Sequence, residues 1–350
     1  MNYLADVKDF GIVLSPDREG GPMYRWDGGG MREAIVNREG EFYYLSYDGA
    51  MPGKTPHSYW NACTARSKDL IHWEKRGVSL FASALTHPYT DCKDFCSASS
   101  PWSFREDGIW YRYYLGADHC SAEGVPAFLY STMLATAASM EGPWTKKCDQ
   151  PDCAGHVCFP AGEPGTWDDV TVSPGEVLRN PKYGMAPGSK KYMMFYSGSC
   201  SGMTQRSIGI ARTDDLHATD DYHRKTGNFW IKDRDPILPP SEDIENSSIY
   251  FDEERKLYWL FTNHVYQNSY TDAVWVYWTS DLDRWNPEDK AIVIDRNVSI
   301  WAKGAIGMPS VYPTDHGTLA VFYDGVPGEG TGHLDRHIGL AEILLPLKVR

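Results

Sequence analysis

The fold is decided by a two-strand pattern that first occurs near the N-terminus. It reads Arg32-Glu33-Ala34-Ile35-Val36, then a turn, then Glu41-Phe42-Tyr43-Tyr44-Leu45-Ser46-Tyr47. Further copies of an apolar strand, a turn and an aromatic-rich strand occupy residues 100–114, 174–196, 245–261 and 308–323. Equivalent positions 42, 110, 192, 258 and 320 lie 62 to 82 residues apart. This spacing holds four strands with their turns, so the sequence predicts five copies of one unit.

A second motif recurs downstream of the aromatic strand. Ser67-Lys68-Asp69-Leu70-Ile71-His72-Trp73 matches Thr279-Ser280-Asp281-Leu282-Asp283-Arg284-Trp285. A degraded copy lies at residues 213–217 and a variant at residues 138–144. We expect the Ser, Thr or Asp side chain to cap the turn and the Trp to pack between neighbouring sheets.

The repeats predict an all-β fold, a five-bladed β-propeller with about four antiparallel strands per blade. Residues 1–350 form one domain in this interpretation, and blades begin near residues 32, 99, 173, 245 and 308. Residues 7–14 are expected to close the last blade as its outer strand. In a propeller the first strand of each blade lines a central channel, so residues far apart in sequence converge there. An all-β sandwich with coincidental repeats is the alternative fold.

Composition restricts the kind of protein and its ligand. Hydrophobic residues make up 42% and charged residues 23%, and no apolar run is long enough to span a bilayer as a helix. The net charge of −13 and the lack of a Lys/Arg-rich run argue against nucleic acid as a partner. The 13 Trp, 22 Tyr and 12 Phe, together with many carboxylates, suit a polar ring-shaped ligand such as a sugar. No membrane partner is expected.

Two properties stay open at this point. The start of the chain does not match a signal peptide, but a trimmed leader would look the same, so localisation is undecided. None of the eight cysteines forms a Cys-x-x-Cys pair, which disfavours a zinc site. Disulfides in an exported protein and buried free thiols are both compatible with this pattern.

Three acids stand at predicted first-strand starts: Glu33, Glu176 and Glu245. We expect them to occupy the same position in three of the five repeats and so to meet in the channel. Two carboxyl groups that flank a glycosidic bond are what its hydrolysis requires, one as acid and one as base or nucleophile. A third acid nearby raises the pKa of the acid by like-charge repulsion.

These features resemble the five-bladed β-propeller glycoside hydrolases of the clan that includes families 43 and 32. Residues 32–36 resemble the first-blade strand that carries their base or nucleophile. Glu245-Asn246-Ser247-Ser248-Ile249-Tyr250 resembles the family 43 strand that carries the general acid. Family 43 normally has Asp in blade one and Asp-Pro in blade three, where this chain has Glu33 and Ser173-Pro174-Gly175-Glu176. The chain is therefore identified as a divergent member of this group.

The resemblance implies a hydrolase that removes a terminal sugar from a plant or algal glycan. Glu33 is the expected base, Glu245 the acid, and Glu176 an acid or pKa modulator, with Glu176 and Glu245 interchangeable; Asp168 or Asp169 is an alternative third acid. The family 43 likeness implies inversion, with the two carboxyls about 6.5–9.5 Å apart, whereas about 5 Å would indicate retention. Candidate substrate contacts are Arg32, Trp102, Asp169, His264, Trp301 and Lys303.

No cofactor is expected, although His333 and His337 are candidates to ligate an axial calcium ion. A glycoside phosphorylase on the same fold is an alternative activity. It needs several cationic side chains for phosphate, of which Arg32 and Lys303 are the obvious ones in the sequence. A glycan-binding propeller without catalysis is a second alternative.

Overall fold

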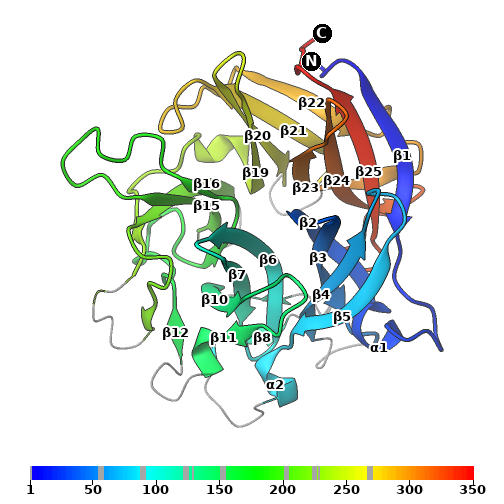
Figure 1. Ribbon diagram of the computed structural model, residues 1–350, viewed down its shortest axis with the longest axis horizontal. Helices are drawn as coiled ribbons and strands as arrows, with labels where there is room; N and C mark the ends of the chain where they lie inside the picture. Colours follow the sequence, from blue (N-terminus) through cyan, green and yellow to red (C-terminus); the bar gives the residue numbers. More distant parts are fainter. Residues whose placement is uncertain are drawn as a thin grey trace.

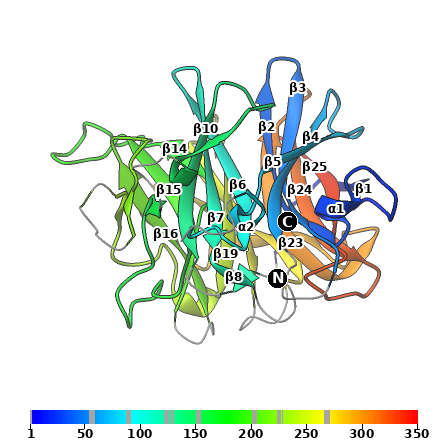
Figure 2. The ribbon, with the colours of Figure 1, turned by 90° about the horizontal axis from the view of Figure 1, so that it is seen from below.

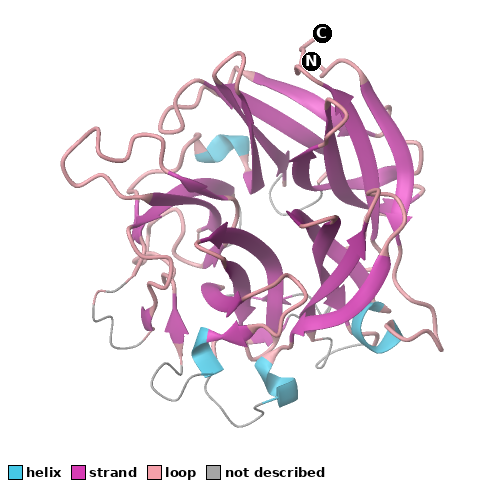
Figure 3. Ribbon diagram, viewed as in Figure 1, coloured by secondary structure: helices cyan, strands magenta, loops and turns pink. Residues whose placement is uncertain are grey.

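The computed structural model is built almost entirely from β-strands (Figures 1 and 3). It describes residues 2–53, 59–86, 92–120, 126–127, 130–149, 155–200, 205–222, 227, 229–265 and 271–350. Helices in this part are single turns, namely α1 (Tyr24–Asp27), α2 (Ser83–Thr86), η1 (Lys147–Asp149) and η2 (Pro240–Glu242). No helix in these ranges has the length and apolar character needed to span a membrane. The predicted all-β class is confirmed.

We divide the described strands, which surround a central axis (Figure 1), into five consecutive antiparallel groups called units 1 to 5. Unit 1 is β2 (Gly30–Glu39), β3 (Phe42–Ala50), β4 (Trp60–Ser67) and β5 (Glu74–Leu80), and unit 2 is β6 (Ser97–Glu106), β7 (Ile109–Ala117), β10 (Ser131–Ala137) and β11 (Thr145–Lys146). Units 1 and 2 share one eight-stranded sheet, because β4 pairs in parallel with β6. Unit 3 is β13 (Thr171–Ser173), β14 (Val177–Arg179), β15 (Tyr192–Ser199), β16 (Arg206–Thr213) and β18 (Ile231–Lys232). Unit 4 is β19 (Ile244–Asp252), β20 (Leu257–His264), β21 (Ala273–Thr279) and β22 (Lys290–Asp295). Two short ribbons, β8 (His119–Cys120) with β9 (Pro126–Ala127) and β12 (His156–Val157) with β17 (Asp220–Asp221), lie outside these units.

Unit 5 joins the two ends of the chain. It contains β23 (Ala302–Pro313), β24 (Thr318–Pro327) and β25 (His337–Leu344), and its outer strand is β1 (Val7–Leu14), antiparallel to β25. The N- and C-termini accordingly lie together at one edge of the molecule (Figure 1). Figure 2 shows strands such as β2, β3 and β10 running between the two faces of the molecule.

The hydrophobic core is divided among the interfaces between neighbouring units. One cluster joins Val36 and Leu45 of unit 1 to Phe322 and Leu340 of unit 5. Equivalent clusters join units 1 and 2, 2 and 3, 3 and 4, and 4 and 5. The second strands are therefore covered on both faces, and β15 is buried along its whole length. This explains why these strands read as continuous aromatic and aliphatic runs instead of alternating ones.

The Ser-x-Asp-Leu-x-x-Trp motif forms the turn predicted for it. The Ser67 hydroxyl accepts hydrogen bonds from the backbone N–H groups of Asp69 and Leu70, and the Trp73 indole donates to the Leu70 carbonyl at 2.8 Å. The Trp73 ring packs edge-on against Phe322 of unit 5. Trp285 makes the same bond to Leu282 and contacts Phe195 of unit 3. The predicted packing of these rings between sheets is confirmed.

A buried tyrosine–acid–lysine group ties each of units 1 to 4 together. In unit 1, Tyr47 and Lys75 both donate to Asp27, at 3.2 and 2.6 Å. The matching groups are Tyr114–Asp94–Lys146, Tyr196–Asp168–Lys232 and Tyr277–Glu242–Lys290. In each, the acid precedes the innermost strand and the lysine lies on the outermost strand. The group thus fixes where the chain enters the central strand.

Each innermost strand except that of unit 3 contains a bulge with one left-handed residue. These residues are Glu33 (φ 47°), Ser100 (φ 50°), Asn246 (φ 64°) and Met308 (φ 53°). Non-glycine residues in this conformation cost of order 1–3 kcal/mol and need support from their surroundings. The support is a hydrogen bond from the N–H group of each to a side chain on the second strand of the preceding unit.

The four side chains that accept these bonds occupy one equivalent position. Asp48 accepts from Ser100 (2.6 Å), Ser197 from Asn246 (2.9 Å), Asn263 from Met308 (3.0 Å) and Asp324 from Glu33 (3.3 Å). We call this bond the inter-unit latch. At the junction of units 2 and 3 the acceptor position holds Leu115 and the donor position holds Pro174, which has no N–H group. This junction therefore lacks both partners of the latch, and neither a donor nor an acceptor is left unsatisfied at these two positions.

The cysteines are of both kinds left open by the sequence. Cys63, Cys148 and Cys158 are free thiols, whereas Cys96 is disulfide-bonded. These three thiols are buried, and burial raises the pKa of groups such as Cys158 and favours the unreactive thiol form.

The inter-unit latch predicts a stability effect at Asn263. Its Oδ1 atom accepts from Met308 N and from Asn246 Nδ2, both at 3.0 Å. Asn263→Leu leaves these buried donors without a partner, which we expect to lower the free energy of unfolding by about 1–3 kcal/mol for each group. Chemical denaturation measures this loss. The control Asn286→Leu, at an exposed turn residue, should stay within about 0.5 kcal/mol of wild type; equal effects of the two changes would contradict the latch.

Candidate active site

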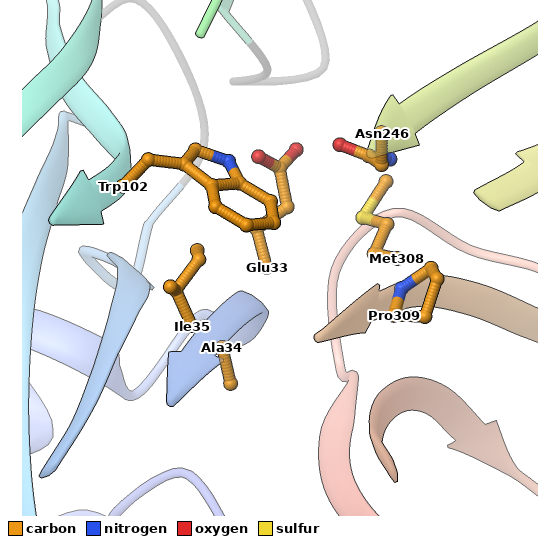
Figure 4. A pocket seen from close by; sticks show the side chains of 7 residues that line it. All are labelled: Glu33, Ala34, Ile35, Trp102, Asn246, Met308 and Pro309. Atoms are coloured by element: carbon orange, nitrogen blue, oxygen red, sulfur yellow. The ribbon is translucent and has the colours of Figure 1, made fainter. Parts of the chain in front are cut away.

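Glu33 lies at the bulge of β2 and faces the central axis. It lines a small cavity with Ala34, Ile35, Trp102, Asn246, Met308 and Pro309. Figure 4 shows its carboxylate between the Trp102 ring and the Asn246 amide, with Met308 on the Asn246 side. In the described part of the chain, the Glu33 Oε2 atom and the Trp102 indole N–H have no hydrogen-bond partner, although both are buried. The cavity therefore presents one unsatisfied acceptor and one unsatisfied donor.

The electrostatic surroundings of Glu33 favour its protonated form. Burial raises the pKa of its carboxyl, and the negative charges of Glu245 and Asp324 add to this rise. The Arg32 guanidinium, 3.7 Å from Glu33 Oε1, opposes it. The net direction is upward, because burial in a medium of low dielectric disfavours the charged carboxylate.

Glu245 on β19 is the second carboxyl group at this site. Its Oε2 atom accepts a hydrogen bond of 2.5 Å from Arg206 Nη1, on β16 of unit 3. A guanidinium at this distance stabilises the ionised carboxylate. Glu245 is 9% exposed and its charge acts on Glu33, so two carboxyl groups from distant parts of the chain lie in one region with different partners.

The structure corrects the predicted equivalence of the three acids. In the sheet register Glu245 stands opposite Asn263, immediately before the bulge, whereas Glu33 is itself the bulge residue. Glu176 comes after the equivalent point of unit 3, where its carbonyl accepts from Phe195 N at 2.9 Å. The three acids therefore occupy three different positions of the repeat. The bulge is what an alignment by strand starts misses, because it adds a residue to one strand only.

The Glu176 side chain makes its hydrogen bonds to unit 4. Its Oε2 atom accepts from the Ser248 hydroxyl at 3.2 Å and from Ile249 N at 3.4 Å. Burial raises the pKa of Glu176 to about 7, and these two bonds hold it from rising further. The carboxyl thus changes charge near neutral pH inside the ring of first strands.

Further charged groups surround Glu33 and Glu245, and most of them were not predicted from the sequence. Asp48 and Asp324 are the latch acceptors next to Arg32, and Arg336 donates to Asp324 Oδ1 at 2.7 Å. Burial, together with the charge of Glu33, raises the pKa of Asp48 well above its usual range. The available signal was a repeated Tyr-x-Gly at the ends of the second strands, in which x is Asp48, Leu115, Ser197 and Asp324.

Tyr130 and His333 complete the surroundings. Burial raises the pKa of Tyr130 to about 12, and Arg206, Arg32, Glu245 and Glu33 all act electrostatically on its hydroxyl. Burial and the charges of Arg32, Arg336 and Arg206 lower the pKa of His333 to about 3, so its ring is neutral. Its Nδ1 atom lies 3.3 Å from Arg32 Nη1. Neither residue follows a motif that the sequence makes visible.

Of the predicted substrate contacts, Arg32 and Trp102 lie with Glu33, and the other four have partners elsewhere. Asp169 accepts from Gly165 N, and His264 lies 3.0 Å from the Tyr277 hydroxyl. Trp301 donates to the Tyr323 hydroxyl at 2.7 Å. Lys303 donates to the carbonyls of Arg296 and Ser299. Asp168, the alternative third acid, belongs to the tyrosine–acid–lysine group of unit 3.

The two histidines proposed for calcium are separated by their contacts. His333 faces the Arg32 guanidinium, whose charge is an unfavourable neighbour for a cation, and His337 Nδ1 lies 2.8 Å from the Ser15 hydroxyl. Among the described residues, no group of three or more His, Cys, Asp or Glu side chains has the geometry to hold a metal ion.

Comparison with known proteins shows similarity in fold. No protein-family model matches the sequence, and no curated protein matches it. Among solved structures, BT0996 in its RGII complex has a TM-score of 0.70 at 17% identity, and the alignment covers 97% of this chain and 92% of BT0996. Zg3597, a family 117 glycoside hydrolase of Zobellia galactanivorans, has a TM-score of 0.62 at 15% identity, with coverages of 97% and 90%.

A third similar structure is the catalytic domain of a GH62 α-L-arabinofuranosidase from Coprinopsis cinerea. Its TM-score is 0.61 at 11% identity, and the alignment covers 97% of this chain and 96% of that domain. The chain therefore has the fold of the β-propeller glycoside hydrolases, as the repeats predicted, with little of their sequence.

The raised pKa of Glu176 predicts a pH dependence of stability. An unfolded glutamate has a pKa of about 4.3, and the folded value is about 7. Between these values the folded protein binds more protons, so stability falls as pH rises, by roughly 3 kcal/mol once pH exceeds 7. Glu176→Gln should remove this contribution, so its unfolding free energy should fall less steeply than that of wild type from pH 5 to 8. The raised pKa values of Glu33 and Asp48 keep the rest of the slope. The exposed control Glu253→Gln should keep the wild-type slope; a slope unchanged in Glu176→Gln would refute the assignment.

Proposed function

We propose that this protein is a glycoside hydrolase whose reaction takes place at Glu33 and Glu245. The observation that supports the proposal most is that two largely buried carboxyl groups near the axis have different surroundings. Burial raises the pKa of Glu33, whereas Glu245 forms an ion pair with Arg206. A proton donor and a carboxylate facing one bond are the requirement for glycosidic cleavage. The propeller fold shared with glycoside hydrolases is consistent with this activity.

We assign Glu33 as the general acid and Glu245 as the base that activates water. This reverses the roles inferred from the family 43 resemblance. The reason is electrostatic: the acid must hold a proton at the working pH, and burial and neighbouring negative charge raise the pKa of Glu33. Arg206 stabilises the charge that a base needs. The Trp102 N–H, which has no hydrogen-bond partner among the described residues, offers a hydrogen bond to a substrate oxygen beside Glu33, and the Trp102 ring offers a face for stacking.

The substrate that we propose is a terminal pentose or deoxy-sugar of a plant or algal glycan, released with inversion. Among proteins of this fold, the GH62 enzyme is named as an arabinofuranosidase. A hydrolysis screen of aryl furanosides and pyranosides of arabinose, xylose, galactose, fucose and rhamnose tests the sugar, and NMR of the released anomeric proton tests the stereochemistry.

A glycoside phosphorylase is the second candidate activity. The observation that favours it is the set of guanidinium groups around the two carboxyls, those of Arg32, Arg206 and Arg336. Release of a sugar 1-phosphate that depends on phosphate would identify this activity. A glycan-binding propeller would bind sugars but show no turnover on any substrate.

The acid and base assignments predict different responses to the leaving group. Glu33→Gln should lose about 10²–10⁴-fold in kcat on a substrate with a poorly acidic leaving group. It should keep most of its activity on a dinitrophenyl glycoside, because that leaving group departs without a proton. Glu245→Gln should lose activity on both substrates, and the exposed Glu41→Gln on neither.

Initial rates on the two substrates, measured from pH 4 to 9, separate the outcomes. The limb that falls at high pH should lie above the ordinary glutamate range, because the pKa of Glu33 is raised. Rescue of Glu245→Gln instead of Glu33→Gln by the good leaving group would reverse the roles. Full activity of both variants would place the reaction elsewhere.

A further inference from the structure

The charged groups at the axis are unequally paired. Arg336 forms a 2.7 Å ion pair with Asp324, and both side chains are at most 1% exposed. Arg206 is paired with Glu245 at 2.5 Å. Arg32 has the weaker arrangement: its guanidinium is 3.7 Å from Glu33 and 3.3 Å from neutral His333. It also stacks on the Trp60 ring, with its central carbon 4.5 Å from the ring centre.

The chemistry proposed for Glu33 removes the charge that Arg32 faces. A general acid is neutral before it reacts. Of the two other carboxyls that act on Arg32, Asp48 has a raised pKa and Asp324 is already paired with Arg336. Arg32 is 7% exposed, and its Nε atom has no hydrogen-bond partner within the described residues. A buried guanidinium without a matching anion is strongly unfavourable. When Glu33 is protonated, Arg32 therefore has no carboxylate of its own to balance its charge.

We propose that the axial site binds an oxyanion on Arg32, with Arg206 on the other side of the same space. The proposal rests on the proposed function, since it concerns what the site holds when Glu33 carries its proton. Arg32 and Arg206 both act on the Tyr130 hydroxyl and on the His333 ring, so the two guanidiniums border one region. Planar guanidinium groups suit carboxylate and phosphate oxygens, which they bind in pairs of hydrogen bonds.

Two sources supply an oxyanion of this chemistry. One is the carboxylate of a sugar acid, in which case the substrate is a uronic acid glycoside. The other is inorganic phosphate. In that case a phosphate oxygen attacks the anomeric carbon, the glycosidic C–O bond breaks, and the Glu33 proton goes to the leaving oxygen, which yields a sugar 1-phosphate.

The test measures binding first, without turnover. Calorimetry compares galacturonate with galactose, glucuronate with glucose, and inorganic phosphate with chloride at equal ionic strength. We expect at least one oxyanion to bind tenfold or more tightly than its neutral or chloride counterpart. Its affinity should fall as pH rises, because binding favours protonated Glu33, and heats in two buffers should show proton uptake. Equal affinity for sugar acids and neutral sugars, with no binding of phosphate, would overturn the proposal.

Arg32→Met should abolish the preference for the oxyanion, and Arg32→Lys should keep part of it. The matched control is Arg38→Met on the same strand, where Arg38 pairs with exposed Asp315. Near-ultraviolet circular dichroism checks that each variant is folded. If Arg32→Met does not fold, the wild-type comparison of sugar acid with neutral sugar and its proton uptake still decide the question.

Turnover then distinguishes the two sources and the two proposals. Hydrolysis of an aryl uronide in preference to its neutral counterpart supports the carboxylate source, and phosphate-dependent release of sugar 1-phosphate supports phosphate. Oxyanion binding without any turnover supports the oxyanion site and contradicts the hydrolase. Hydrolysis of neutral glycosides only, without oxyanion binding, supports the hydrolase and contradicts the oxyanion site.

Discussion

The inter-unit latch is the bond on which the arrangement of the central strands depends. A left-handed residue in each bulge turns its N–H group toward the neighbouring unit, and a side chain at one fixed position accepts it. The bond fixes the position of one unit along the strand direction relative to the next. Hydrophobic packing between sheets does not fix this position, because the hydrophobic effect is not directional. Between units 2 and 3 the latch is replaced on both sides, since the Leu115 side chain has no acceptor and Pro174 has no N–H donor.

The same bond positions the proposed acid. Glu33 donates this bond at the junction where unit 5 meets unit 1. The bond that joins these two units therefore also holds the residue that carries the proposed acid. Asp324 is held in turn by Arg336, whose Nε atom donates to the Gly332 carbonyl. The strained conformation of Glu33 is therefore supported by a chain of buried polar bonds. Asp324 also contributes negative charge that raises the pKa of Glu33, which gives one side chain a structural and an electrostatic effect.

Features that depend on contacts between residues close in sequence could be predicted, and features that depend on contacts between distant residues were harder to predict. The Ser67–Trp73 turn is bonded within seven residues, so its composition predicts it fully. The repeat predicts the fold, because each unit buries its aromatic strands against the next. The bulge is not visible in composition, and so Glu33, Glu176 and Glu245 were placed at one position although they hold three. Arg206 became visible only through its bond to a residue 39 positions away.

The units differ more at the latch position than at the tyrosine–acid–lysine group. The tyrosine–acid–lysine group keeps its chemistry in units 1 to 4, even though unit 4 takes its tyrosine from the third strand. The latch position varies among Asp, Leu, Ser, Asn and Asp, and only its two aspartates are ionisable. Asp48 stands opposite Arg32 within unit 1, and Asp324 lies on the neighbouring unit 5. The asymmetry that a reactive centre needs thus arises at the latch position. Every unit except unit 2 requires a hydrogen-bond acceptor there, and a carboxyl group meets this requirement and is also ionisable.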